Sequence, residues 1–164
     1  MCGIVGIIGN KHVSERLVSA LKRLEYRGYD SAGIAVLTGD TIDRRRAKGK
    51  IVNLCKVLDD TPIDGRIGIA HTRWATHGAP SKENAHPHKS GRVAIVHNGI
   101  IENYDEIRRS LSHRTFESET DTEVAAHLID EYLSQGMDPH VAVAEALAQF
   151  RGAYALGILI AGTE

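Results

Sequence analysis

The sequence predicts an α+β fold in which largely antiparallel sheets are faced by helices. Three observations lead to this prediction. Short apolar segments follow one another at hairpin spacing, with a turn signal at residues 38–41 between the strand-like stretches 32–37 and 42–47. Other segments carry apolar residues at helical spacing. The chain has no internal repeat, and 164 residues suit one domain with a sizeable core.

The elements of the first half follow in order. Residues 3–8 are an apolar run typical of a short buried strand, and residues 13–26 carry their apolar side chains on one helical face. The hairpin is followed by a short helix over 50–58 and a strand over 66–71. Residues 72–91 are rich in Gly, Pro, His, Ser and Asn and predict a long loop, a type that often serves as a lid.

In the second half, capping residues mark two helix starts. After a buried strand over 92–97 and a short helix over 103–112, Thr120-x-x-Glu123 is a capping-box pattern that opens a helix to residue 133. Asp138 followed by Pro139 predicts a helix to residue 150. The apolar strand over 153–161 either closes a sheet or is followed by more polypeptide, in which case the domain is truncated at the C-terminus.

Composition excludes several classes of function. The net charge is −1, which gives no basic footprint for nucleic acid, and no stretch approaches the ~20 apolar residues of a membrane span. The N-terminus lacks the basic start of a signal peptide. Cys2 and Cys55 do not make a disulfide framework, so we expect a reducing, cytoplasmic location. Cys55 lies on the apolar face of a predicted helix and is expected in the core.

Cys2 is the candidate nucleophile. Once Met1 is removed, residue 2 carries both a thiol and a free α-amine. The thiolate is the nucleophilic form, and an α-amine with a pKa of about 7.7–8.0 is substantially neutral at working pH and can act as the base. We expect a bridging water, because direct proton transfer would need a strained ring. The alternative is that Cys2 is an arbitrary small hydrophobic residue.

Five segments in order resemble one enzyme family. They are MCGIVGIIG at 1–9, LEYRGYDSAG at 24–33, HTRWATHG at 71–78, HNGIIEN at 97–103 and ETDTE at 119–123. Together they are similar to the glutaminase domains of class II glutamine amidotransferases, and the strings YRGYD and TRWATHG resemble the sugar-aminating branch, the glutamine–fructose-6-phosphate aminotransferases. The resemblance implies a glutaminase domain over residues 1–164, possibly incomplete, with the layered α-β-β-α sandwich of N-terminal-nucleophile hydrolases.

The resemblance also implies an activity that needs no cofactor. Cys2 would attack the side-chain amide of L-glutamine, release ammonia and pass through a γ-glutamyl thioester to glutamate. In the longer enzymes a sugar-phosphate isomerase domain, absent from these 164 residues, uses the ammonia to make glucosamine 6-phosphate from fructose 6-phosphate. The expected partners are therefore glutamine and that domain, in a homo-oligomeric full-length enzyme, with neither nucleic acid nor a membrane.

Asn98 and Gly99 are the predicted oxyanion hole. Attack on an amide places negative charge on the carbonyl oxygen, which needs hydrogen-bond donors aimed at it. The pair follows a buried strand and can supply a side-chain amide and a backbone N–H, and the resemblance implies this role at both positions. Taken alone, Asn-Gly favours a plain turn.

Arg73 and Asp121 are candidates for binding the charged groups of glutamine. A planar guanidinium suits a carboxylate, and an aspartate can hold an ammonium. The resemblance implies these roles, although Asp121 also suits the start of the capped helix. It places Trp74, Thr76 and His77 in the same pocket wall, as part of a lid that excludes water.

Four further positions are expected to support the site. Arg27, Gly28 and Asp30 resemble family positions around the nucleophile, and His86 is expected to help order the lid. His88 is expected at the surface. Five of the nine histidines fall between residues 71 and 97, but they lack acidic or cysteine partners at ligand spacing, so no metal is expected. The basic run 44–46 is expected to be a solvated strand face.

Two other functions stay open. A glutaminase half could serve another acceptor, such as phosphoribosyl pyrophosphate, although the motif strings argue against it. The chain could also be a non-catalytic glutamine-binding module, against which the intact Cys2 and Asn98-Gly99 argue.

Overall fold

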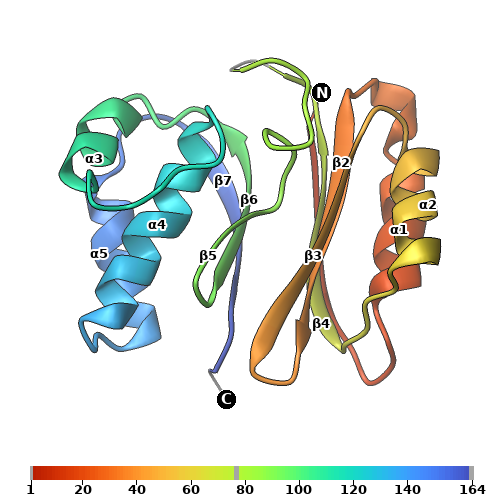
Figure 1. The fold of residues 1–164 in the computed structure, drawn as a ribbon, viewed down its shortest axis with the longest axis horizontal. Coiled ribbons are helices and arrows are strands. Elements are labelled where there is room, and N and C mark those ends of the chain that lie inside the picture. The colour runs from red at the N-terminus through yellow and green to blue at the C-terminus, as the bar shows by residue number, and fades with distance from the viewer. Residues whose placement is uncertain (1, 76–77, 163–164) are drawn as a thin grey trace.

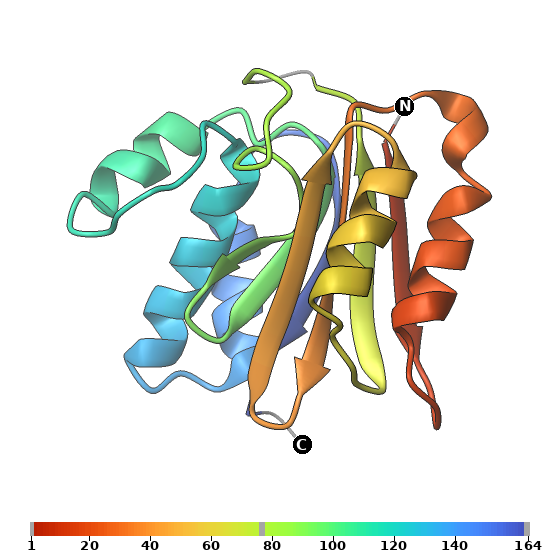
Figure 2. The same ribbon diagram turned by 45° about the vertical axis from the view of Figure 1, so that its right-hand side comes forward.

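The computed structural model, which describes residues 2–75 and 78–162, is a layered sandwich (Figure 1). Its elements are β1 (Gly3–Ile8), α1 (Ser14–Lys22), η1 (Glu25–Arg27), β2 (Ser31–Thr38), β3 (Thr41–Lys48), α2 (Ile51–Asp60), β4 (Ile67–Arg73), β5 (His88–Ser90), β6 (Val93–Gly99), α3 (Tyr104–Ser110), α4 (Asp121–Ser134), α5 (Pro139–Gln149) and β7 (Tyr154–Ile160). Helices α1 and α2 cover the outer side of one sheet and α3 to α5 the outer side of the other, as Figure 2 shows from a second direction. The expected α-β-β-α order is confirmed.

All strand pairings in the described residues are antiparallel, as the hairpin spacing predicted. One sheet has the order β1-β4-β2-β3 and the other β5-β6-β7. Gly3 at the start of β1 lies opposite Thr72 near the end of β4. This register brings the residue before β1 beside the residues that follow β4.

Three apolar clusters hold the described layers together. One packs α1 and α2 onto the first sheet around the fully buried Leu17, and Cys55 packs partly buried against it, as expected. A second lies between the two sheets and contains Ile69 and Val96. The third packs the second sheet onto α3 to α5 around Ile129. Burial of apolar surface therefore fixes the spacing of the layers.

Both predicted helix caps are confirmed. The Thr120 side chain accepts a hydrogen bond from the Glu123 amide at the start of α4, and Asp138 accepts from the first amides of α5, where Pro139 is the first helical residue. The cap at Thr120 matters for the site because Asp121 is the first residue of α4. Among the helices described, none has the length and apolar character that a membrane crossing requires.

Two predicted boundaries differ in the structure. The helix expected over 13–26 ends at Lys22 and gives way to the 3-10 turn η1. The loop expected over 72–91 contains β5, which pairs with β6. β5 forms because its backbone groups find partners on β6. It was not predicted because a strand of three residues is too short to show an alternating pattern in the sequence.

Candidate active site

Cys2 lies immediately before β1 and beside the end of β4. The Trp74 amide donates a hydrogen bond to Cys2 Sγ at 3.2 Å, and Sγ lies 3.6 Å from the Trp74 carbonyl oxygen. A thiol is both a weak donor and a weak acceptor, so the two contacts hold the sulfur in one place. The cysteine is only partly buried, which leaves it accessible.

The Cys2 side chain faces a cavity of about 280 Å³ built from both sheets and from α4. Its lining residues are Cys2, Arg73, Trp74, His86, His97, Gly99, Ile100, Thr120, Asp121 and Thr122. The fold thus brings residues from distant segments to one place, and those also singled out in the sequence for the site are Cys2, Arg73, Trp74, His86, Gly99 and Asp121. Its volume lies near the low end of the about 300–1,000 Å³ usual for small-molecule sites, which suits a ligand of amino-acid size.

Asn98 and Gly99 end β6, on the sheet that does not carry the nucleophile. Asn98 Nδ2 donates to the Cys2 carbonyl oxygen at 3.4 Å. Gly99 has a φ of 121°, and a Cβ there would lie 2.2 Å from the Ala153 carbonyl oxygen. Only glycine fits this position. Asn98 therefore bonds to the Cys2 backbone without itself lining the cavity, and Gly99 lines the same cavity as Cys2. Their role as an oxyanion hole stays a prediction.

Arg73 and Asp121 place opposite charges in the cavity wall. Arg73 ends β4 and is 4% exposed, and Asp121 begins α4 and is 8% exposed. Asp121 Oδ2 accepts the Ile101 amide at 2.9 Å, while Oδ1 lies 3.6 Å from His97 Nδ1. A buried cation and a buried anion facing one small cavity suit a zwitterionic ligand.

Asp30 and Gly28 support the segment that carries Trp74. The Asp30 amide donates to the Arg73 carbonyl oxygen at 2.7 Å, and its carboxylate accepts from the Ala75 amide. Gly28 has a φ of 73°, and a Cβ there would lie 2.7 Å from the Trp74 ring. The indole, 52% exposed, therefore occupies the space that a side chain at position 28 would need.

Three of the predicted residues cannot be placed in full. Thr76 and His77 lie outside the described residues, as does Met1. Arg27 ends η1, but its side chain is likewise outside the described part.

A cluster of buried histidines adjoins the cavity. Its members are His71, His86, His88 and His97, each 5% exposed or less. The ring centroids of His71 and His86 are 4.3 Å apart, and those of His86 and His88 are 4.7 Å apart. Burial lowers the pKa of His71 to about 4 and of His88 to about 3, and with the neighbouring histidines it lowers the pKa of His86 well below its usual range. The rings of His71, His86 and His88 are therefore neutral at neutral pH.

The expected exposure of His88 is wrong. His88 is 1% exposed because it opens β5, and Thr120 Oγ1 lies 3.0 Å from its Nε2 and supplies a hydrogen-bond partner. His86 Nε2 lies 2.8 Å from Thr122 Oγ1, which in turn lies 2.9 Å from His97 Nδ1. A part for His86 in ordering a lid stays a prediction. Within the described residues, no group of three or more His, Cys, Asp or Glu side chains is arranged to hold a metal ion.

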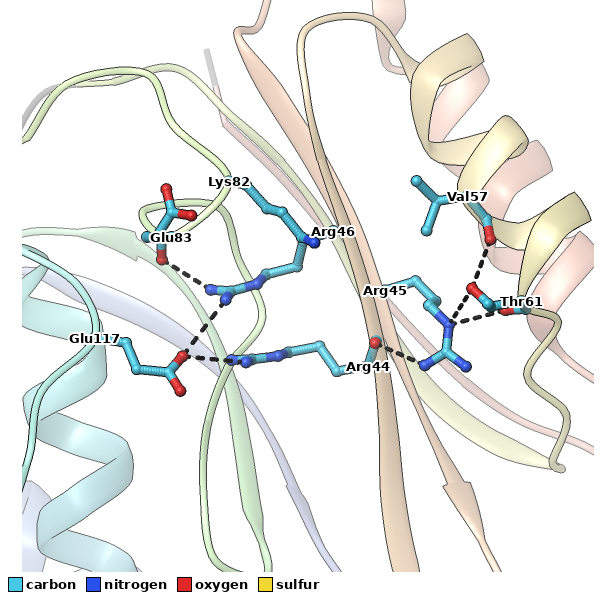
Figure 3. A pocket seen from close by; sticks show the side chains of 8 residues that line it. All are labelled: Arg44, Arg45, Arg46, Val57, Thr61, Lys82, Glu83 and Glu117. Carbon is cyan, nitrogen blue, oxygen red and sulfur yellow. Dashed lines mark hydrogen bonds and ion pairs between the residues drawn. The ribbon is translucent and has the colours of Figure 1, made fainter.

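A larger cavity, of about 520 Å³, lies along β3 (Figure 3). Among the described residues, none lines both this cavity and the first. The basic run 44–46 was expected to be a solvated strand face, and this is wrong for Arg46, which is only 7% exposed. Arg46 Nη1 donates to the carbonyl oxygens of Glu83 and Ala85 at 2.8 and 2.9 Å. The sequence around Arg46 predicted a solvated face because its partners, the carbonyl oxygens of Glu83 and Ala85, are distant in the chain. Nothing in the neighbouring residues indicates such a partner.

The other two arginines also bond within the protein. The Glu117 carboxylate lies 3.4 Å from Arg44 Nη2 and 3.7 Å from Arg46 Nη2, while Arg45 points to the opposite side of the strand and donates to the Thr61 carbonyl oxygen at 2.8 Å (Figure 3). We interpret the contacts of Arg44 and Arg46 as a structural link between β3 and the segments that contain Glu83 and Glu117.

Sequence reasoning left His71, His97 and Thr122 without a role. His71 and Arg73 are two residues apart on β4, as are His97 and Gly99 on β6, and such pairs share one face of a strand. This alternation is the signal that could have placed both histidines beside the site. Thr122 offered no comparable signal, because its partners come from other elements.

Comparisons with known proteins agree with this geometry. Residues 71–163 match the model of a glutamine amidotransferase domain. The chain is 60% identical, over 97% of its length, to glutamine–fructose-6-phosphate aminotransferase (isomerizing) of Zymomonas mobilis, and 58% identical, over 99%, to that of Bradyrhizobium diazoefficiens. It spans 26% and 27% of those relatives, about a quarter of their length.

Solved structures give the same fold. Glutamine phosphoribosylpyrophosphate amidotransferase from B. subtilis superposes with a TM-score of 0.79 at 27% identity, covering 98% of this chain and 35% of that one. A glutamine aminotransferase class-II domain protein from Silicibacter pomeroyi has a TM-score of 0.60 at 17% identity, covering 96% of this chain and 72% of that one, and shows the fold alone.

Proposed function

Because this chain belongs to the glutamine amidotransferase domain family, we propose that it hydrolyses L-glutamine to glutamate and ammonia through a thioester on Cys2. The observation that carries the proposal is the convergence of Cys2, Gly99, Arg73 and Asp121 on one small cavity. A nucleophile, an oxyanion donor and two groups of opposite charge are what a selective glutaminase needs.

The reaction begins after removal of Met1. The freed α-amine of Cys2 takes the thiol proton through a water molecule, and Sγ attacks the side-chain carbonyl carbon of glutamine. The oxyanion that forms accepts hydrogen bonds from Asn98 Nδ2 and the Gly99 amide. As the tetrahedral intermediate collapses, the α-ammonium returns its proton to the leaving nitrogen, and ammonia departs.

Hydrolysis of the thioester completes the cycle. Water adds to the thioester carbonyl, the α-amine accepts its proton, and the same donors stabilise the second oxyanion. Sulfur then leaves and recovers the proton, giving glutamate and the free Cys2 thiol. The α-carboxylate of glutamine pairs with Arg73 and its α-ammonium with Asp121, which orients the amide toward the sulfur.

The neighbouring segment acts as the lid. Trp74, Thr76 and His77 cover bound glutamine and exclude water until ammonia has left. Asp30 and Gly28 support this role, because Asp30 bonds on both sides of Trp74 and Gly28 makes room for its ring. Arg27 and His86 complete the surroundings of the nucleophile.

In the parent polypeptide, the ammonia passes to a sugar-phosphate isomerase domain that makes glucosamine 6-phosphate from fructose 6-phosphate. The names and greater length of the relatives at 58–60% identity support this proposal. The 27% identity to the phosphoribosylpyrophosphate amidotransferase favours the sugar acceptor over the alternative. We also propose a homo-oligomeric full-length enzyme in the cytoplasm, with no cofactor in this domain.

The decisive experiment is the intact mass of the purified protein before and after a diazoketone analogue of glutamine. We expect the mature chain to lack Met1 and to carry one adduct, on Cys2. Cys55→Ser should keep the adduct, whereas Cys2→Ala should lose both adduct and glutamate release while keeping its fold. A retained Met1, or an adduct on Cys55 alone, would rule out the mechanism and favour a non-catalytic module.

A further inference from the structure

The Asn98 side chain is held between His71 of the other sheet and Cys2, which lies just before that sheet's strand β1. Its Nδ2 donates to the Cys2 carbonyl oxygen at 3.4 Å, and its Oδ1 lies 2.8 Å from His71 Nε2. His71 belongs to β4 and Asn98 to β6, so this contact crosses between the sheets. The proposed oxyanion donor is therefore oriented by a histidine that does not itself line the cavity.

The two ends of a carboxamide are chemically opposite, so its orientation decides what it offers the substrate. The Cys2 carbonyl oxygen can only accept, which requires Nδ2 on that side and Oδ1 toward His71. Oδ1 can only accept as well, so Nε2 of His71 must carry a proton. If the His71 ring carried its proton on Nδ1 alone, the lone pair of Nε2 would face a lone pair of Asn98 Oδ1. That repulsion would favour the flipped carboxamide, with Nδ2 toward His71.

The surroundings of His71 favour the tautomer with hydrogen on Nε2. The ring is 1% exposed, and burial, as the main cause, lowers its pKa to about 4, so it is neutral with a single N–H. Its Nδ1 makes no well-aligned hydrogen bond within the described residues, although the nearby His97 backbone raises the ring's pKa against the effect of burial. A proton on Nδ1 would be buried and poorly satisfied, whereas a proton on Nε2 meets Asn98 Oδ1 at 2.8 Å. The ring of His86, with its centroid 4.3 Å away, packs against it and holds it in place.

We infer that His71 is a positioning residue, whose Nε2–H fixes the Asn98 carboxamide with its N–H toward the reacting carbonyl. The inference rests on the proposed function and deepens it, because it names what keeps the oxyanion hole in its donating orientation. His71 acts through Asn98 and touches no substrate. Loss of its N–H leaves Asn98 in place but free to present an oxygen, which repels the developing oxyanion.

Three substitutions separate this role from simple packing. His71→Gln keeps an amide N–H at about the reach of Nε2, His71→Asn keeps one only at the reach of Nδ1, and His71→Leu keeps none. We expect kcat for glutamate release to fall roughly 10- to 100-fold in the Leu and Asn variants, as for weakening of one oxyanion donor. KM should stay within about threefold, because Arg73 and Asp121 hold the substrate. The Gln variant should recover most of kcat.

A second assay checks the integrity of the nucleophile. Alkylation of Cys2 by iodoacetamide forms no oxyanion, so its rate should be similar in all variants. The inference would be overturned if kcat and the rate of Cys2 alkylation fell together, KM rose, and the His71→Gln variant recovered none of the activity. Those results would assign His71 a purely structural role.

Where a variant does not fold, the unsubstituted protein still provides a test. Nitrogen-15 NMR of the His71 ring distinguishes the tautomers, and we expect the proton on Nε2 at neutral pH. A proton on Nδ1 would overturn the inference. An unsubstituted protein that releases no glutamate would contradict the proposed function instead, and an active one in which His71→Leu keeps its full kcat would contradict only the role of His71.

Discussion

The Asp121 carboxylate accepts the Ile101 amide at 2.9 Å, which ties the first residue of α4 to the segment just after Asn98 and Gly99. One side chain thus joins the proposed ammonium site to the proposed oxyanion hole. Its charge and its hydrogen bond can be separated experimentally, because a carboxamide oxygen can keep the bond without the charge.

Asp121→Asn should therefore weaken substrate binding while leaving the fold intact. A hydrogen bond to a charged group contributes about 1.5–3 kcal/mol, so we expect KM for glutamine to rise roughly 10- to 100-fold. Steady-state glutamate release measures the change. Asp105→Asn, at an exposed position on α3, serves as the control and should leave KM unchanged. An unchanged KM in Asp121→Asn would remove Asp121 from the ammonium site.

Gly28→Ala should displace the Trp74 ring, because the new Cβ would lie 2.7 Å from it. Trp74 is the only tryptophan in the chain, so its fluorescence reports the displacement directly. Gly39→Ala is a matched control, with a φ of 59° and nothing within 4 Å of the added carbon. Both variants carry the cost of a side chain at a positive φ, on the order of 1–3 kcal/mol, but only Gly28→Ala should shift the emission and slow Cys2 labelling. Identical spectra would refute the contact.

Acid should destabilise the protein through its buried histidines. The pKa is lowered to about 4 in His71 and about 3 in His88, against about 6.5 in the unfolded chain, so the unfolded state binds more protons below pH 6.5. Their contribution to stability is complete above pH 6.5 and is lost as the pH falls toward 4 and then 3.

The slope of this loss is about 1.4 kcal/mol per pH unit for each histidine still neutral in the fold. Denaturant unfolding at pH 7, 6 and 5 measures it. His88→Gln should flatten the dependence, whereas His140→Gln, at an exposed position, should not. A free energy of unfolding that is independent of pH between 7 and 5 would contradict the buried neutral cluster.

Arg46→Met should destabilise the fold because the carbonyl oxygens of Glu83 and Ala85 would lose their donor. Leaving buried acceptors unsatisfied costs about 1–3 kcal/mol. Arg109→Met, at an exposed position on α3, should change stability by less than about 0.5 kcal/mol. Thermal and denaturant unfolding compare the two, and equal effects would show that Arg46 is as solvated as its sequence context suggests.

Local signals in the sequence carried much of the fold. The caps at Thr120 and Asp138 and the turn between Thr38 and Thr41 depend on neighbouring residues only, and each is present in the structure. The burial of His88 and Arg46 could not be predicted, because each depends on a partner distant in the chain. The hydroxyl of Thr120 and the carbonyl of Ala85 become available only when the layers are assembled.

The candidate site was likewise predictable where it depends on local motifs and not where it depends on distant partners. Motif strings identified Cys2, Arg73 and Asp121 as residues with the right chemistry, but not that the cavity draws on both sheets and α4. The bond between Asp121 and Ile101 and the histidines beside the cavity emerged only from the structure.

The apolar cluster between the sheets has an evolutionary consequence. Cys2 lies immediately before β1 of one sheet and Asn98 in β6 of the other, so the volume of side chains such as Ile69 and Val96 sets how far the sulfur stands from the proposed oxyanion donor. If the proposed reaction is the selected one, drift in these interior residues is filtered by its rate as well as by folding. Paired, volume-compensating exchanges across the interior should be accepted over time, whereas single exchanges that keep the protein folded should still be removed by selection.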